Sequence, residues 1–225
     1  MSDQIQAVLQ LAKTPALKEV LLPHVYESER SVMWESVLYD GLSHSQKIAL
    51  GWAYALWRDE KPPEDWLDPF HSFHEVDLET RTAILRAFAT RHGFTHFEID
   101  SHEPPLLPAG SEKARQSALD RLAEHSSFMG FLDVLATSRA APETWSTKGL
   151  SGGQKAAVSW AYSIRIAKLP PEGWRDPFEG FSILDMDMQA FVLRVFAEAN
   201  GFFQFEASRT LSQVEKVYEK MRPKG

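Results

Sequence analysis

The chain has 225 residues, of which 44% are hydrophobic and 12% aromatic, so it can bury a substantial core and is not a disordered protein. Its formal net charge of −7 argues against nucleic acid or an anionic membrane as the main partner, since both need clustered Lys and Arg. The absence of cysteine excludes disulfides, thiolate metal sites and cysteine nucleophiles. The polar N-terminus has no signal-peptide pattern, and no apolar run approaches the roughly 20 residues of a membrane span, so we expect a cytoplasmic protein.

Helices are predicted first, in DQIQAVLQLA (3–12) and TPALKEVLL (14–22), where Thr14 is a suitable N-cap and Pro15 fits a first turn. A longer helix is predicted after LSHSQ (42–46). Its apolar stripe has helical spacing and consists of Ala49, Trp52, Ala53 and Leu56.

The next segment, PPEDWLDPFHSF (62–73), reads as a rigid connector, in which Asp68 caps a turn and Pro69 occupies the first helical position. Its aromatic residues Trp66 and Phe70 either anchor the segment on the helices beneath or line a groove for a partner. The same two interpretations apply to Trp174 and Phe178 in the matching segment further along.

A further helix is predicted after Asp77, a good N-cap, and it should end at Gly93. The run FTHFEI (94–99) alternates in the manner of a short strand. The proline-rich stretch HEPPLLPAG (102–110) is predicted to be a linker. Helices are then expected in SEKARQSALDRLAEH (111–125), FMGFLDVLA (128–136) and LSQVEKVYEKM (211–221).

The rest of the second half repeats the first. Residues 42–77 align without a gap on residues 150–185, and residues 83–98 on 191–206, so matched positions lie 108 residues apart, as Trp52 and Trp160 do. The alignment predicts an internal duplication. Accordingly, a second pair of helices should begin near Ser151 and after Asp185, the latter ending at Gly201, and a second short strand should lie in FFQFEA (202–207). The two strands are expected to pair across a pseudo-two-fold axis.

The string LSGGQ (150–154) is also the signature pentapeptide of ABC-transporter ATPases. Those proteins need a G-x-x-x-x-G-K-[ST] phosphate loop, which the chain lacks. The aligned string LSHSQ keeps only the serine and the glutamine, which is the pattern of a capping box at a helix start. We therefore interpret Ser151 and Gln154 as a helix cap.

Histidine is confined to the first 125 residues, and HSFHE (71–75) contains His71 and His74 close to Asp77. These three residues are candidate ligands for Zn²⁺ or another divalent metal, or a source of a general base. In the second repeat the histidines are replaced by Glu179 and Ser182, so such a site would belong to the first repeat alone. A second pair of candidates, Glu98 and Glu206, are matched acids at the predicted strands. They are either twin active-site acids or polar positions of an alternating strand.

The predicted fold is all-α with at most two very short strands, built as a tandem duplication of a small helical unit in a pseudo-two-fold arrangement. The predicted boundaries are 1–103 for the first repeat, 104–110 for the connector and 111–225 for the second repeat. The leading functional hypothesis is a non-catalytic adaptor, inhibitor or immunity-like protein, without a cofactor, that binds a protein partner and is a monomeric pseudo-dimer. Its candidate partner-binding residues are Trp66, Phe70, Trp174 and Phe178. The alternatives are a metal-dependent enzyme using His71, His74 and Asp77, and a small-molecule binder with an aromatic cleft between the repeats.

Overall fold

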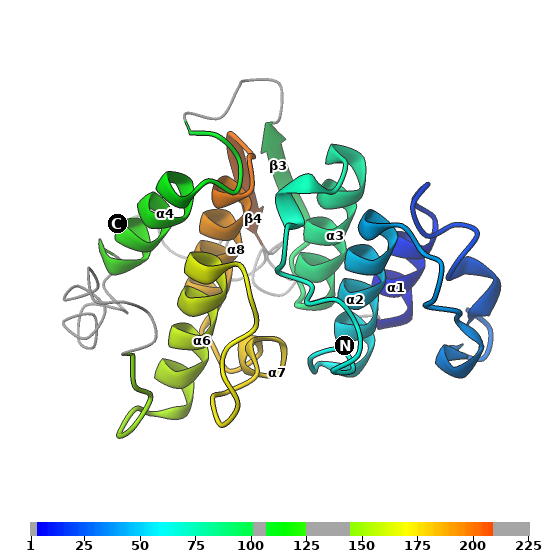
Figure 1. The fold of residues 1–225 in the computed structure, drawn as a ribbon, viewed down its shortest axis with the longest axis horizontal. Helices are drawn as coiled ribbons and strands as arrows, with labels where there is room; N and C mark the ends of the chain where they lie inside the picture. Colours follow the sequence, from blue (N-terminus) through cyan, green and yellow to red (C-terminus); the bar gives the residue numbers. More distant parts are fainter. Residues whose placement is uncertain (1–3, 101–106, 125–144, 209–225) are drawn as a thin grey trace, which may run out of the picture.

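The computed structural model describes residues 4–100, 107–124 and 145–208, and this part of the chain is mostly helical. Figure 1 shows α1, α2 and α3 in one half and α4, α6 and α8 in the other, with strands β3 and β4 between them. The α-helices are α1 (Gln4–Ala12), α2 (His44–Arg58), α3 (Leu78–Arg91), α4 (Glu112–Glu124), α6 (Gly152–Ile166), α7 (Pro177–Phe181) and α8 (Met186–Ala199). Short 3₁₀ helices cover Leu22–His24, Trp34–Ser36 and Phe73–Glu75.

The capping boxes predicted at the starts of α2 and α6 are confirmed. In each, the backbone N–H of the glutamine donates to the serine hydroxyl at 3.3 Å, and the backbone N–H of the serine donates to the glutamine side chain at 2.9 Å. A Cβ added at Gly152 or Gly153 would meet nothing within 4 Å, so neither glycine is needed for space. The LSGGQ string is therefore a helix start.

The predicted starts and ends of α3 and α8 are also confirmed. The carboxylates of Asp77 and Asp185 each accept a hydrogen bond of 2.8 Å from a backbone N–H in the first turn. Beyond the last turns, Gly93 and Gly201 adopt positive φ angles of 86° and 93°, the left-handed conformation that commonly terminates a helix.

The helix predicted for residues 14–22 is wrong. This segment forms consecutive turns and only a short 3₁₀ helix at its end. The hydroxyl of Thr14 points back and donates to the carbonyl of Leu11 at 2.7 Å. Thr14 thus closes the end of α1 instead of opening a new helix.

Aromatic side chains of both halves meet in the centre of the molecule, and the buried hydrophobic residues form one continuous cluster. The ring of Trp52 lies 5.2 Å from that of Phe178, edge to face, and the matched ring of Trp160 lies 5.5 Å from Phe70. Each indole N–H donates to a carbonyl in its own repeat, Trp52 to Pro69 at 2.9 Å and Trp160 to Pro177 at 2.7 Å. These contacts anchor both Pro-Pro-Trp segments onto the core.

The connector segments also exchange hydrogen bonds. One carboxylate oxygen of Asp68 accepts the backbone N–H of Leu169 at 2.6 Å, and the matched Asp176 accepts the backbone N–H of Lys61 at 2.6 Å. The second oxygen of each aspartate accepts a backbone N–H two residues further on in its own segment. We call these contacts the reciprocal aspartate bonds.

Strands β3 (His96–Asp100) and β4 (Gln204–Ser208) pair antiparallel, as expected for the two alternating runs. Glu98 lies directly opposite Glu206, and these positions are 108 residues apart. A second small ribbon joins β1 (Val25–Tyr26) to β2 (Ser31–Val32), and the sequence patterns did not predict it.

The two matched connectors differ in local structure. Residues 177–181 form helix α7, whereas the first repeat reaches a helical turn only at Phe73–Glu75. A Cβ added to Gly180 would lie 2.8 Å from the Cβ of Ala156, so the glycine permits close approach of α7 to α6. The corresponding residues of the first repeat are the bulkier Ser72 and Ile48, and Ser72 takes a positive φ of 53°.

The helices predicted at 128–136 and 211–221 lie outside the described residues, as do residues 104–106 of the predicted connector. Its described residues, 107–110, form no helix or strand. The proposed boundaries of the repeats stay a prediction.

Candidate functional site

The four aromatic residues predicted to contact a partner fall into two classes. Phe70 and Phe178 are each 1% exposed and lie in the central aromatic cluster, where their rings are 5.5 Å apart. A partner has no access to them, because the connectors fold inward onto the core. Trp66 and Trp174 are half-buried at the surface and keep part of their rings accessible. Of the four residues, Trp66 and Trp174 therefore stay candidates for contact with a partner.

A shallow surface groove surrounds Trp66, and we call it the Trp66 groove. It forms where the start of α2 meets the connector and the irregular chain before α2. Its lining residues are Tyr39, Leu42, His44, Lys47, Asp65, Trp66 and Leu67.

The aromatic floor of the groove is stacked. The ring of Tyr39 lies nearly parallel to that of Trp66, with centroids 4.7 Å apart and an angle of 13° between the planes. Tyr54 of α2 meets the other side of Trp66 edge to face at 5.4 Å. Behind them the buried Trp34 packs on Tyr54 at 5.1 Å. Each ring of the floor therefore packs against the next.

Charged groups of both signs border the floor. The ammonium of Lys47 lies 5.0 Å from the centre of the Tyr39 ring, a cation–π distance. Burial raises the pKa of the Tyr39 phenol, the nearby charge of Asp65 raises it further, and a hydrogen bond from the backbone N–H of Leu67 opposes the rise. The phenol stays protonated at neutral pH, so Tyr39 acts in the groove as a neutral aromatic group.

The chain matches no known protein family, no curated protein and no solved structure.

No helix within the described ranges is both long and apolar enough to cross a membrane.

A related aromatic arrangement lies in the second repeat. Trp174 packs edge to face on Tyr162 at 5.3 Å, and Trp145 meets Tyr162 at 6.2 Å. The polar border differs, because His44 and Asp65 are matched by Gly152 and Gly173, and the chain between Trp145 and Leu150 contains no tyrosine. The second repeat thus keeps the aromatic support of Trp174 and lacks the stacked tyrosine and the carboxylate. This difference makes Trp174 a natural control for Trp66.

The predicted metal ligands do not assemble into a metal site. Among the described residues, no group of three or more His, Asp or Glu side chains is placed to hold a metal ion. Asp77 is occupied as the N-cap of α3, and the Nε2 atom of His74 lies 3.9 Å from a carboxylate oxygen of Glu75. The ring of His71 lies 6.4 Å from that of His44, which itself contacts Glu75. Burial lowers the pKa of His74, and the cations Arg115 and Arg81 nearby lower it further.

The matched acids Glu98 and Glu206 lie opposite one another on the paired strands, where like charges oppose each other. Glu206 is bound by the guanidinium of Arg194 at 2.7 Å. A carboxylate held by an arginine in this way forms a structural ion pair.

The sequence patterns missed Tyr39 and Lys47 as groove residues. Tyr39 lies in an irregular stretch with no periodicity and precedes the aligned residues, so comparison of the repeats gave no signal for it. Its place depends on the hydrogen bond from Leu67 and on stacking against Trp66, both of which are tertiary contacts. Lys47 is kept as Lys155 in the second repeat, which was the one available hint.

Proposed function

We propose that this protein is a non-catalytic interaction protein that binds a protein partner through the Trp66 groove. The observation that carries the proposal is the stack of Tyr39 on Trp66 at the surface, bordered by Lys47 and Asp65. Tryptophan and tyrosine are the residues that most often dominate the energy of protein interfaces.

The shape of the groove favours a protein over a small metabolite. Small-molecule sites are concave and enclose most of their ligand, whereas the Trp66 groove is shallow and lies on the outer surface. Exposed apolar residues also occur in the adjoining chain: Met33 is 45% exposed and Leu38 is 79% exposed. Apolar anchors with charged neighbours are typical of a protein–protein interface.

Affinity capture from a native lysate tests this proposal when three baits are used side by side. The wild-type protein and the Trp174→Ala variant should recover the same protein in stoichiometric amounts, and Trp66→Ala should lose it. The matched variant controls for general effects of removing a half-buried tryptophan. Equal loss in both variants, or equal recovery by all three baits, contradicts the proposal.

We also propose that the chain is an internal duplication whose halves form a monomeric pseudo-dimer in the cytoplasm. Support comes from matched contacts: the Trp52–Phe178 and Trp160–Phe70 ring pairs, the reciprocal aspartate bonds, and the register that sets Glu98 opposite Glu206. A two-fold axis between the paired glutamates relates the members of each pair. Since the halves already cover one another's aromatic faces, we expect a monomer. Size-exclusion chromatography with light scattering measures the mass of the protein in solution.

A further inference from the structure

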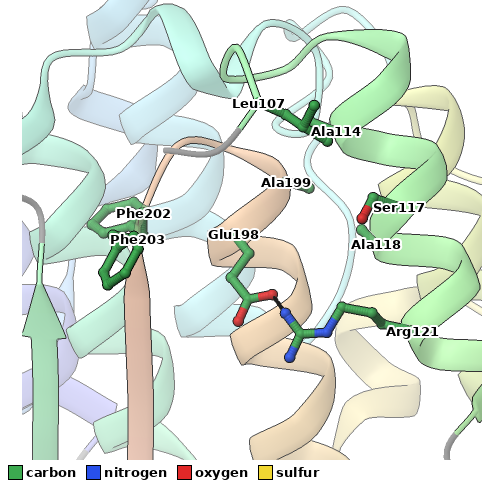
Figure 2. A pocket seen from close by; sticks show the side chains of 9 residues that line it. All are labelled: Leu107, Ala114, Ser117, Ala118, Arg121, Glu198, Ala199, Phe202 and Phe203. Atoms are coloured by element: carbon green, nitrogen blue, oxygen red, sulfur yellow. Dashed lines mark hydrogen bonds and ion pairs between the residues drawn. The ribbon is translucent and has the colours of Figure 1, made fainter. Parts of the chain in front are cut away.

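A small hollow lies between helices α4 and α8, away from the Trp66 groove. Figure 2 shows its walls: Leu107 and Ala114 lie at one end, and the ion pair between Arg121 of α4 and Glu198 of α8 lies at the other. The remaining lining residues are Ser117, Ala118, Ala199, Phe202 and Phe203. Phe202 is fully buried, whereas Phe203 is 37% exposed and leaves one side accessible.

Three alanines create this space. Ala114, Ala118 and Ala199 are each buried, and their methyl groups are too short to fill the gap between the two helices. At the position matched to Ala199, the first repeat has Arg91, which has a long side chain. The hollow therefore lies where α4 and α8 present small side chains to one another.

The volume limits the occupant. The open space is about 130 Å³. An apolar cavity of about 150 Å³ is known to hold one benzene molecule, whereas sites for nucleotides and other cofactors measure about 300 Å³ or more. A single six-membered ring fits, and a nucleotide or dinucleotide does not.

The charged residues beside the hollow further limit which molecules can occupy it. Arg121 and Glu198 neutralise each other, and the nearby Arg194 is held by Glu206 at 2.7 Å. A charged ligand would add an unbalanced charge beside this neutral ion pair. It would also lose its hydration on entering walls that are mostly alanine, leucine and phenylalanine, with one hydroxyl from Ser117. A neutral hydroxyl can donate a hydrogen bond to Glu198 or accept one from Arg121, because both groups have capacity beyond their mutual contact.

We propose that the hollow between α4 and α8 binds a small neutral aromatic molecule that carries one hydroxyl group, of about the size of phenol. The apolar walls hold the ring, and the Arg121–Glu198 pair receives the hydroxyl. This site is independent of the Trp66 groove, so either proposal can fail without the other.

Titration of the full-length protein with phenol tests the site by methyl NMR, with alanine methyl groups labelled. Phenol should shift the signals of Ala114, Ala118 and Ala199 in a saturable manner and leave those of Ala49 and Ala53 in α2 unchanged. Benzoate and benzylammonium, which are charged analogues, should bind at least about tenfold more weakly. Absence of saturation up to the solubility of phenol, or equal binding of the charged analogues, would overturn the proposal.

Two variants on α4 localise the binding. Ala118→Gln introduces a long side chain into the hollow and should weaken phenol binding at least about tenfold. Lys113→Gln changes an exposed position on the same helix and should leave binding unchanged. Circular dichroism verifies the fold of each variant, and if Ala118→Gln does not fold, the three alanine signals of the wild-type protein decide alone. Undiminished phenol binding in a folded Ala118→Gln variant would overturn the site.

Discussion

At the scale of single residues, the helix caps show how the same local chemistry recurs with different neighbours. Ser43 with Gln46 and Ser151 with Gln154 form capping boxes of the same dimensions, although the residues between them are His-Ser in one and Gly-Gly in the other. A Cβ added at Gly152 or Gly153 would meet nothing within 4 Å, and both capping boxes form, so the residues between serine and glutamine do not determine the helix start.

Removing the α6 cap should therefore destabilise the protein, and changing its glycines should not. Ser151→Ala should lower the free energy of unfolding by about 1 kcal/mol, since a backbone N–H loses its acceptor. The double change Gly152→His with Gly153→Ser should leave it within about 0.5 kcal/mol of wild type. Urea denaturation measures both. A larger loss from the double change than from Ser151→Ala contradicts the cap interpretation.

Gly180 is the residue that lets α7 approach α6. Gly180→Ala places a methyl group 2.8 Å from the Cβ of Ala156, a separation that real side chains do not adopt. We expect a loss of about 1 to 3 kcal/mol in the free energy of unfolding from this overpacking. Gly173→Ala has open space around its Cβ but a positive φ of 84°, so it reports backbone strain alone. A smaller loss for Gly180→Ala than for Gly173→Ala would contradict the packing explanation.

At the scale of elements, the reciprocal aspartate bonds join the two connectors. Burial raises the pKa of Asp68 and of Asp176, and the backbone N–H groups that they accept oppose the rise without cancelling it. The carboxyls of Asp68 and Asp176 therefore stay protonated to a higher pH in the folded state than in the unfolded state, where they titrate near 3.8. In the window above that value the folded state binds more protons, so the contribution of these groups to stability falls as pH rises.

The double variant Asp68→Asn with Asp176→Asn tests this sign. The stability of wild type minus that of the variant should decrease as pH rises from about 4 through the raised pKa of the two carboxyls, and should become constant above it. Urea unfolding at a series of pH values gives this difference in stability. The contributions of the other carboxyls cancel in it, because both proteins contain them. A difference that increases with pH would show that the folded state depresses these pKa values.

Regular elements were predictable from the sequence where a local signal defines them. The caps at Ser43, Ser151, Asp77 and Asp185 follow from short-range chemistry. The pairing of the alternating runs, which lie 108 residues apart, was predicted from the alignment of the two halves. The segment after Thr14 has a helical pattern, but the hydroxyl of Thr14 donates to the carbonyl of Leu11 and so closes α1. The inward burial of Phe70 and the stack of Tyr39 on Trp66 depend on contacts between distant segments, which no local pattern encodes. The hollow between α4 and α8 depends on small residues, which give no motif.

At the scale of the whole molecule, the aromatic cluster makes the two halves depend on one another. Trp52 and Trp160 each contact Phe70 and Phe178, so four rings from both repeats share one environment. The halves cannot separate without exposing these rings to water.

Phe70→Ala and Phe178→Ala should each reduce the free energy of unfolding by about 3 to 5 kcal/mol, because each leaves a cavity in the shared cluster. Unfolding followed by tryptophan fluorescence and by far-ultraviolet circular dichroism should give one coincident transition in both variants. Two separate transitions, with each variant shifting only one of them, would show that the repeats are independent domains.

The proposed function depends on a protein partner binding at the Trp66 groove. The dissociation constant of the captured partner tests this most directly. Calorimetric titration should give similar constants for the wild-type protein and for Trp174→Ala. The constant for Trp66→Ala should be raised by about thirtyfold or more, the effect of removing a dominant interface residue, with both variants shown to be folded. Equal constants for all three proteins, or an equal loss in the two variants, would contradict the assignment of the groove as the partner site.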